Sequence, residues 1–409
     1  MDRLDTNQII KYSSIDLKNP KYLSNDIDWS RKQNNKFSKM HSISYYLAMF
    51  CPALPSYFID IYSNKNSVIM DNFSGRGTTA LVCREKGRKF IGSDLNPYAF
   101  VLSKAKTLTS TKDKLIKTID KLEKEFLNSD YKQIKINYHI IPNKELSYFY
   151  SDYTLKQLLF LRENYGKNWK ELDNELTIIF SFALGLMHGP TKKNNTTIYF
   201  SLSMPNTISM SPNYVFNYSK SKKLKRPQIN IFDQLKNRIN SKFDENLFKS
   251  KYDGKIYFQD ATQPNKNIKN NSVNLVITSP PYLNIVNYTR SNWLKLWLLG
   301  YERETLKEKI RLSDTLKFDQ YISFIKNYLN VIYSKLKNKA KVCLIIGDVF
   351  ETNLIETVWK TIEKDVKYKF IEIYYDTKYL QVHKATNMLN SKKGKATKID
   401  KVLVLEKNE

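Results

Sequence analysis

Apolar residues along the chain alternate between short strand-like runs and longer stretches with helical spacing. The short runs predict strands at 68–70, 89–94, 255–258, 272–277 and 341–346, and a closing pair at 370–375 and 401–405. Helical spacing predicts helices over 41–62, 79–86, 99–126, 154–165, 172–185, 318–336 and 353–364. Short strands that alternate with helices are typical of a parallel sheet with crossover helices. We therefore expect an α/β fold with a mostly parallel seven-stranded sheet.

This alternation is interrupted after the second strand. The 160 residues at positions 95–254 separate Asp94 from the next strand, which is far more than a crossover connection needs. Within them, residues 189–230 are rich in Asn, Ser, Thr, Lys and Pro, with Tyr and Phe interspersed. The sequence therefore predicts three regions: 1–130 with the first half of the sheet domain, 131–250 as a helical and irregular insert, and 251–409 with the second half.

Composition narrows the class of partner. The chain has 409 residues, and 67 Lys and Arg against 40 Asp and Glu give it a net charge of +27. Such an excess favours a polyanion, most often nucleic acid, although Lys, Asn and Ile are frequent throughout, as general compositional drift would also produce. No apolar run is long enough to span a bilayer, and the charged start does not resemble a signal peptide. Three widely spaced cysteines predict neither disulfides nor a zinc site. We expect a cytoplasmic protein without a membrane partner or a bound metal.

A glycine loop, Asp71 to Thr79, follows the first predicted strand and precedes a helix. Gly75 and Gly77 are two of only 11 glycines in the chain, and glycine lets the backbone approach a ligand closely. Asp94 ends the next strand, where an acidic side chain can accept from ribose hydroxyls, and Asp260 ends the strand after that and could accept from an adenine amino group. Two alternatives remain: a tight turn that binds nothing, and the dinucleotide pattern GxGxxG/A of an NAD site.

A second loop, Ser279-Pro280-Pro281-Tyr282, directly follows the strand at 272–277. Two consecutive prolines fix φ and carry no N–H, so this segment extends neither a helix nor a sheet. Ligands of open α/β sheets bind outside the carboxyl ends of the strands, which is where this tetrapeptide would lie. The alternative is a rigid loop or a polyproline ligand.

The two loops together resemble the amino-group (N4-cytosine/N6-adenine) DNA methyltransferase family that uses S-adenosylmethionine. Phe73 to Thr78 is similar to its F-x-G-x-G-T loop, and Ser279 to Tyr282 is similar to its catalytic [S/D/N]-P-P-[Y/F/W]. Residues 37–52 resemble the motif that closes over the methionine end of the cofactor. The resemblance covers 29–110 and 255–409, and is looser at 203–212. The position of the insert departs from the common classes of this family.

The resemblance implies a Rossmann-like methyltransferase fold and S-adenosyl-L-methionine as cofactor. It implies that the cofactor is held by Asp71, Phe73, Ser74, Gly75, Gly77, Thr78, Asp94, Asp260 and Ala261. It implies a catalytic loop of Ser279, Pro280, Pro281 and Tyr282. An exocyclic amine is a poor nucleophile, because its lone pair is conjugated with the ring. The Ser279 hydroxyl and a backbone carbonyl could accept its two N–H groups and direct that lone pair at the methyl group. Tyr282 would stack on a base flipped out of the duplex.

The Ser-Pro-Pro-Tyr form is the one associated with cytosine N4. We therefore expect a site-specific methyltransferase that acts on cytosine N4 in double-stranded DNA, in a restriction-modification or phage-defence system whose endonuclease would lie on another chain. The alternatives are an N6-adenine DNA methyltransferase, an RNA amino methyltransferase, and a DNA-binding module with a decayed pocket. The insert is a candidate target-recognition region, because its basic runs 192–195 and 220–227 flank Tyr199, Tyr214, Phe216 and Tyr218.

Overall fold

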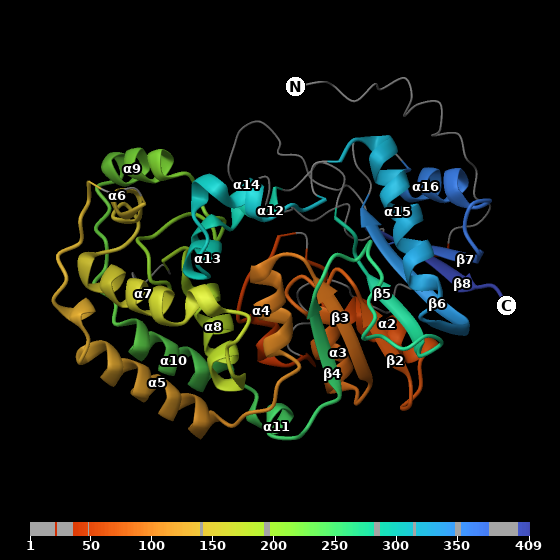
Figure 1. Cartoon of the computed structure of the whole chain (residues 1–409), viewed down its shortest axis with the longest axis horizontal. Coiled ribbons are helices and arrows are strands. Elements are labelled where there is room, and N and C mark those ends of the chain that lie inside the picture. Colours follow the sequence, from red (N-terminus) through yellow and green to blue (C-terminus); the bar gives the residue numbers. More distant parts are fainter. Residues whose placement is uncertain are drawn as a thin grey trace.

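One twisted sheet forms the centre of the computed structural model (Figure 1). The structure describes residues 21–22, 36–47, 49–139, 142–191, 197–281, 287–313, 316–347, 353–375 and 400–409. Its strands are β1 (Lys21–Tyr22), β2 (Val68–Asp71), β3 (Lys89–Asp94), β4 (Gly254–Phe258), β5 (Val273–Thr278), β6 (Leu336–Gly347), β7 (Tyr368–Tyr375) and β8 (Asp400–Lys407). Their order in the sheet is β1-β7-β8-β6-β5-β2-β3-β4.

Neighbouring strands run parallel except where β8 pairs with β6 and with β7. The predicted α/β fold with a mostly parallel seven-stranded sheet is confirmed by β2 to β8, and β1 adds two residues at one edge. Strand β6 begins five residues before the predicted start, at Leu336. The order places β5 between β2 and β6, so the two loops singled out in the sequence follow adjacent strands.

The strands of the sheet centre are buried on both faces. In β5, Leu275 and Ile277 join one apolar core and Val276 joins another, as the alternation of a strand requires. Helices α2 (Ala53–Tyr62) and α3 (Thr78–Glu85) supply the first core, and α15 (Phe318–Tyr333) and α16 (Leu354–Ile362) supply the second. Continuous apolar runs such as that of β5 are typical of parallel strands covered by helices on both sides.

The insert forms a helical body beside the sheet, on the left of Figure 1. Its described α-helices, with those that flank it, are α4 (Pro97–Ala105), α5 (Lys112–Leu127), α6 (Asn143–Leu146), α7 (Asp152–Asn164), α8 (Asn174–Leu186), α9 (Pro212–Ser221), α10 (Ile231–Lys242) and α11 (Glu245–Phe248). Short helices α12 (Tyr288–Ser291), α13 (Trp293–Leu298) and α14 (Leu306–Lys309) follow β5. A third apolar core joins the insert to α4 and α13, so this body packs directly on the sheet domain.

Two helix predictions were wrong in their extent. The helix expected over 99–126 is broken into α4 and α5, because the side chain of Thr111 caps the start of α5 and residues 106–110 contact other parts of the chain. The helix expected over 41–62 is a single 3-10 turn, Lys39–Ser42, followed by α2, which begins after Pro52. Among the described helices, none has both the length and the apolar character needed to cross a membrane.

Arg84 of α3 holds together the two segments that connect the sheet domain with the helical body, near residues 106–108 and 247–250. Its guanidinium donates to the carbonyl oxygens of Lys106 and Leu108 where the chain leaves the sheet domain. It also donates to those of Leu247, Phe248 and Ser250 where the chain returns. Burial lowers the pKa of Arg84 to about 10, which leaves the side chain charged at neutral pH. One buried cation therefore satisfies five carbonyl groups at the junction.

We expect Arg84→Met to lower the free energy of unfolding by at least about 3 kcal/mol, because several buried carbonyl oxygens lose their donor. Chemical denaturation followed by circular dichroism measures this change. Arg88→Met is the matched control and should cost about 1 kcal/mol or less, since within the described residues Arg88 donates to Ser63 Oγ and Lys86 O near the surface. Equal losses in the two variants would show that Arg84 does not hold the junction.

Candidate active site

A pocket lies at the carboxyl ends of β2, β3, β4 and β5. Its walls come from the glycine loop after β2, from residues 94–96 after β3 and from residues 259–261 after β4. Ser279 and Pro281 after β5 line it as well, and the segment before α2 closes it with Tyr46, Leu47, Met49 and Phe50. Four consecutive strand ends thus meet at one concave site, which is the expected ligand position of an open α/β sheet.

The glycine loop has a backbone shape that favours glycine. Gly75 and Gly77 have φ values of +51° and +75°, in the left-handed region. A Cβ on Gly77 would lie 2.8 Å from the Cα of Ser103 in α4, so the loop also lies closely against that helix. The amide of Ser74 donates to the carbonyl of Ser93 at 3.1 Å, which fixes the loop to β3. The turn thereby leaves Phe73, Ser74 and Gly75 facing the pocket.

Asp94, the last residue of β3, lines the pocket. The amide of Gly75 donates to its Oδ2 at 2.8 Å, and the amide of Asn96 donates to its Oδ1 at 2.9 Å. Burial raises the pKa of this carboxyl to about 7. Each carboxylate oxygen has a second lone pair and can accept a further hydrogen bond from a hydroxyl group in the pocket. Asp260 is held differently, because its Oδ1 accepts from the amide and the hydroxyl of Thr262, both at 2.8 Å.

Thr278, the last residue of β5, connects the catalytic loop to the glycine loop. Its hydroxyl donates to Asp71 Oδ1 at 2.6 Å and accepts from the amide of Phe73 at 3.2 Å. The same amide lies 3.2 Å from Asp71 Oδ1. Burial raises the pKa of Asp71 to about 6, and the hydrogen bond from Thr278 opposes that rise. These contacts set the distance between the two loops.

The residues of the catalytic tetrapeptide occupy different environments. Ser279 lines the pocket, and its hydroxyl donates to the carbonyl of Ile345 in β6 at 3.0 Å. Pro281 also lines the pocket, whereas Pro280 is buried behind it. Tyr282 lies outside the described residues, so its expected stacking role stays a prediction.

Most of the predicted cofactor residues come together in the pocket. Seven of the nine line it: Phe73, Ser74, Gly75, Thr78, Asp94, Asp260 and Ala261. Asp71 and Gly77 support the wall from behind, through the contacts described above. The predictions did not single out Tyr46 and Asn96, whose side chains hydrogen bond at 3.2 Å, or Phe324 of α15. Tyr46 lies in an irregular segment and stacks on Tyr288 at 5.5 Å, so periodicity carried no signal for it.

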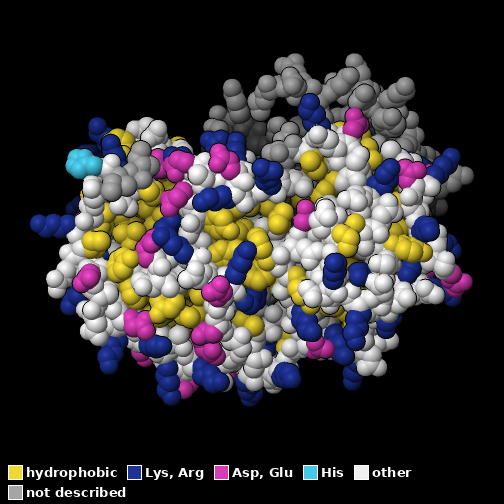
Figure 2. Space-filling view, in the orientation of Figure 1, with side chains coloured by type: hydrophobic (Ala, Val, Ile, Leu, Met, Phe, Trp, Pro, Cys, Tyr) yellow, Lys and Arg dark blue, Asp and Glu magenta, His cyan; other side chains and the backbone are white. Residues whose placement is uncertain are grey.

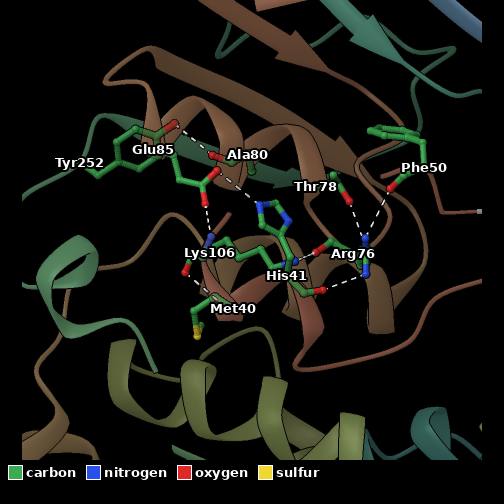
Figure 3. A network of polar contacts seen from close by, with 10 residues as sticks. Met40, His41, Phe50, Arg76, Thr78, Ala80, Glu85, Lys106 and Tyr252 are labelled. Carbon is green, nitrogen blue, oxygen red and sulfur yellow. Dashed lines mark hydrogen bonds and ion pairs between the residues drawn. The ribbon is translucent and has the colours of Figure 1, made fainter. Parts of the chain in front are cut away.

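Arg76 holds the segment that closes the pocket (Figure 3). Its guanidinium donates to the carbonyl oxygen of His41 at 2.8 Å and to that of Phe50 at 3.4 Å, and its Nε donates to Thr78 Oγ1 at 3.0 Å. One carbonyl precedes the pocket residues of this segment and the other belongs to Phe50, the last of them, so one side chain of the glycine loop holds the segment on both sides. Buried Lys106 in turn donates to the carbonyl of Arg76.

Glu85 of α3 anchors the start of the same segment. Its carboxyl accepts from the amide of Ser38 at 2.6 Å and lies 3.5 Å from His41 Nε2. Burial raises the pKa of Glu85 to about 7 and lowers the pKa of His41 well below its usual value. The neutral form of His41 is therefore favoured, whereas Glu85 titrates near neutral pH. The expected closure of residues 37–52 over the methionine end of the cofactor stays a prediction.

Comparison with known proteins agrees with this geometry. A DNA methylase family model, N6_N4_Mtase, matches residues 5–105. The type II methyltransferase M.MjaII of Methanocaldococcus jannaschii is 23% identical over 82% of this chain and 77% of its own length. M.BsoBI of Geobacillus stearothermophilus is 22% identical over 74% of this chain and 61% of its own length. M.MvaI of Kocuria varians is 25% identical over 59% of this chain and 53% of its own length.

Among solved structures, TrmN from Thermus thermophilus is 9% identical to this chain, and the match covers 90% of this chain and 52% of TrmN. Its TM-score of 0.32 is too low to support a structural inference. The fold is a Rossmann-like α/β sheet with a pocket at the carboxyl ends of its strands. By the family model and the curated relatives, the chain is similar to amino-methyltransferases of the N4/N6 DNA methylase type.

S-adenosylmethionine is the methyl donor of this family, and the pocket fits it. The glycine loop would allow close backbone approach, the buried carboxyl of Asp94 would accept from ribose hydroxyls, and Phe73 would offer an apolar surface. Among the described residues, no group of three or more His, Cys, Asp or Glu side chains is placed to hold a metal ion.

Thr278→Val should weaken both folding and catalysis, because it removes the hydroxyl between the two loops and leaves Asp71 without its closest donor. We expect a loss of about 1–3 kcal/mol in the free energy of unfolding and a lower kcat. Thr278→Ser keeps the hydroxyl and should stay close to the wild type. Denaturation curves and methyl-transfer assays of the three proteins test this, and a Val variant that matches the wild type in both would contradict the role.

Cofactor affinity should rise with pH around neutrality. Burial raises the pKa of Asp94 to about 7. The contribution of this carboxyl to the free energy of unfolding of the ligand-free protein is therefore fully present below about pH 4 and is lost as pH rises through 7. Binding of ribose hydroxyls favours the ionised form, and affinity should therefore increase from pH 6 to pH 8, by up to about tenfold per unit below the pKa.

Calorimetric titration of S-adenosylmethionine at several pH values measures this dependence. Asp71 and Glu85 titrate in the same range, with pKa values of about 6 and 7, so Asp94→Asn is the necessary comparison. The Asn variant should bind more weakly and lose most of the pH dependence. An unchanged pH profile in that variant would assign the effect to another group.

Proposed function

We propose that this protein is a site-specific DNA methyltransferase that transfers a methyl group from S-adenosylmethionine to the N4 amine of cytosine. The observation that supports it most is the position of Ser279, beside the cofactor pocket and with its hydroxyl proton directed at Ile345 O. Because the Ser279 hydroxyl donates its proton to Ile345 O, its oxygen can only accept a hydrogen bond from the target amine. Such an acceptor beside the methyl donor orients the amine and does not remove its proton before the transfer.

The residues around the pocket then have separate tasks. S-adenosylmethionine, when bound, supplies a methyl group activated by its sulfonium. Ser279 Oγ accepts one N–H of the target amine, which turns the nitrogen lone pair out of conjugation with the ring. Thr278 and Asp71 keep Ser279 at a set distance from Phe73 and the rest of the glycine loop. Correct placement of the two reactants supplies most of the rate in such a mechanism.

The choice of base rests on the Ser-Pro-Pro-Tyr form of the loop. An N6-adenine enzyme would use the same pocket and the same orientation of the amine, and it is the second candidate. DNA rather than RNA is supported by the similarity to type II methyltransferases. We further propose that the target base is flipped out of the duplex, that residues 131–250 contain the target-recognition region, and that the enzyme works in the cytoplasm as part of a restriction-modification or phage-defence system.

Expression in a host without DNA methylation, followed by mass spectrometry of its nucleosides, tests this function. We expect N4-methylcytosine in the DNA. Ser279→Ala should lower kcat by about 100-fold or more with little change in cofactor affinity, because the hydroxyl acts on the target amine rather than on the cofactor. Detection of N6-methyladenine alone would overturn the choice of base, and methyl label in RNA but not in DNA would overturn the substrate.

A further inference from the structure

The charge of the whole chain does not by itself select a binding surface. Figure 2 shows Lys and Arg side chains spread over the visible face, with acidic side chains among them. Helix α5 is an example, because its Lys117 and Lys121 lie 3.0 and 3.8 Å from Asp113 and Glu125. Such paired cations offer little net field to a polyanion. A surface for nucleic acid should therefore be sought where cations lack acidic neighbours.

One long stretch of the chain meets this condition. The 57 residues from 176 to 232 contain no Asp or Glu and seven Lys or Arg, in a chain with 40 acidic residues among 409. Five of these cations follow or end helix α9, namely Lys220, Lys222, Lys223, Lys225 and Arg226, and all five are exposed. Within the described residues, none of them forms an ion pair. Arg226 donates to the carbonyl of Ser147, which leaves its charge uncompensated.

Helix α9 also exposes aromatic rings, which are unusual on a helix face that contacts only solvent. Tyr214 is 38% exposed and Phe216 is 45% exposed, and they are two of the six large hydrophobic side chains that the described surface exposes. Tyr214 stacks on Tyr218 with ring centres 5.7 Å apart, and Phe216 lies 5.0 Å from Tyr148. Only Pro212 and Val215 of the helix are buried. The rest of the helix is therefore open to a partner.

The start of α9 is attached to the active site. The amide of Ser209 donates to Ser291 O at 2.9 Å, and Trp293 Nε1 donates to Met210 O at 2.9 Å. Ser291 and Trp293 belong to α12 and α13, which follow the catalytic loop, and Tyr288 of α12 lines the pocket. Helices α9, α12 and α14 lie along the same edge of the molecule, at the top of Figure 1, whereas α5 lies at the opposite edge.

We propose that residues 212–226, called here the α9 surface, bind the DNA duplex next to the target base. Lys220, Lys222, Lys223, Lys225 and Arg226 neutralise backbone phosphates. Tyr214 and Phe216 pack against exposed bases or sugars. This inference rests on the proposed function, because it names the part of the insert that holds the same DNA substrate. The connection through α12 and α13 places that duplex at a set position relative to Ser279.

The salt dependence of duplex binding tests the phosphate contacts. A variant with Lys220, Lys222, Lys223 and Lys225 changed to Gln should reduce the slope of log affinity against log salt by about 2 or more, since each lost phosphate contact removes about 0.9. The matched control changes Lys114, Lys117, Lys121 and Lys124 of α5 to Gln, which alters net charge equally and should leave the slope nearly unchanged. Fluorescence anisotropy with a labelled duplex measures both. Equal slopes in the two variants would overturn the proposal.

The aromatic contacts are tested separately. Phe216→Ala and Tyr214→Ala should each weaken duplex binding roughly fivefold to tenfold, because stacking of one base on an aromatic ring has about this value. Leu127→Ala, which changes an exposed residue at the end of α5, is the control and should bind like the wild type. Unchanged affinity in both aromatic variants would assign these rings to another role.

Failure of this proposal is separable from failure of the proposed function. All variants of the α9 surface should bind S-adenosylmethionine like the wild type, because none of these residues lines the pocket. If the wild type methylates DNA but the α9 variants bind duplex normally, the surface is wrong and the function stands. If wild-type protein places no methyl group in DNA, the function is wrong, whatever the α9 surface binds. If the α9 variants lost RNA binding but still bound the DNA duplex normally, the surface would bind RNA and the proposed DNA contact would be wrong.

Discussion

The contact of Thr278 with Asp71 and with the amide of Phe73 is the constraint on which the site depends. A methyl transfer needs a donor and an amine in one fixed orientation, and the two binding loops come from strands some 200 positions apart in the chain. The strand order places β5 next to β2, and the Thr278 hydroxyl then joins their ends at 2.6 Å. Because Asp71 is buried, this hydrogen bond also satisfies one of its carboxyl oxygens, Oδ1, which would otherwise be costly to enclose.

Two buried arginines likewise hold together segments that lie far apart in the sequence. Arg84 binds five carbonyl oxygens at the junction between the sheet domain and the helical body, and Arg76 binds the carbonyls of His41 and Phe50 in the pocket-closing segment. Carbonyl groups outside helices and strands need donors when they are buried, and a guanidinium offers five in a fixed arrangement. Part of the basic character of this chain therefore serves its own architecture and is not available to a partner.

The insert is connected to catalysis through packing rather than through the pocket lining. Its apolar core is continuous with α4 on the sheet and with α13 after the catalytic loop. Lys295 of α13 is buried and donates to Thr207 of the insert at 3.0 Å, while burial lowers its pKa to about 7. A duplex held by the insert would thus be placed by the same elements that support the catalytic loop, which gives recognition and chemistry a common frame.

The sequence by itself determined the main strands of the sheet, the two loops and seven of the residues that line the pocket. A short apolar run such as that of β5, ended by two prolines, favours a buried strand, and the positive φ values of Gly75 and Gly77 favour glycine at both positions. Tertiary structure alone decided which strands are neighbours, and hence that Ser279 and Asp94 share a pocket. It also decided the roles of Tyr46, Arg76 and Arg84, because carbonyl contacts between distant segments leave no periodic trace in a sequence.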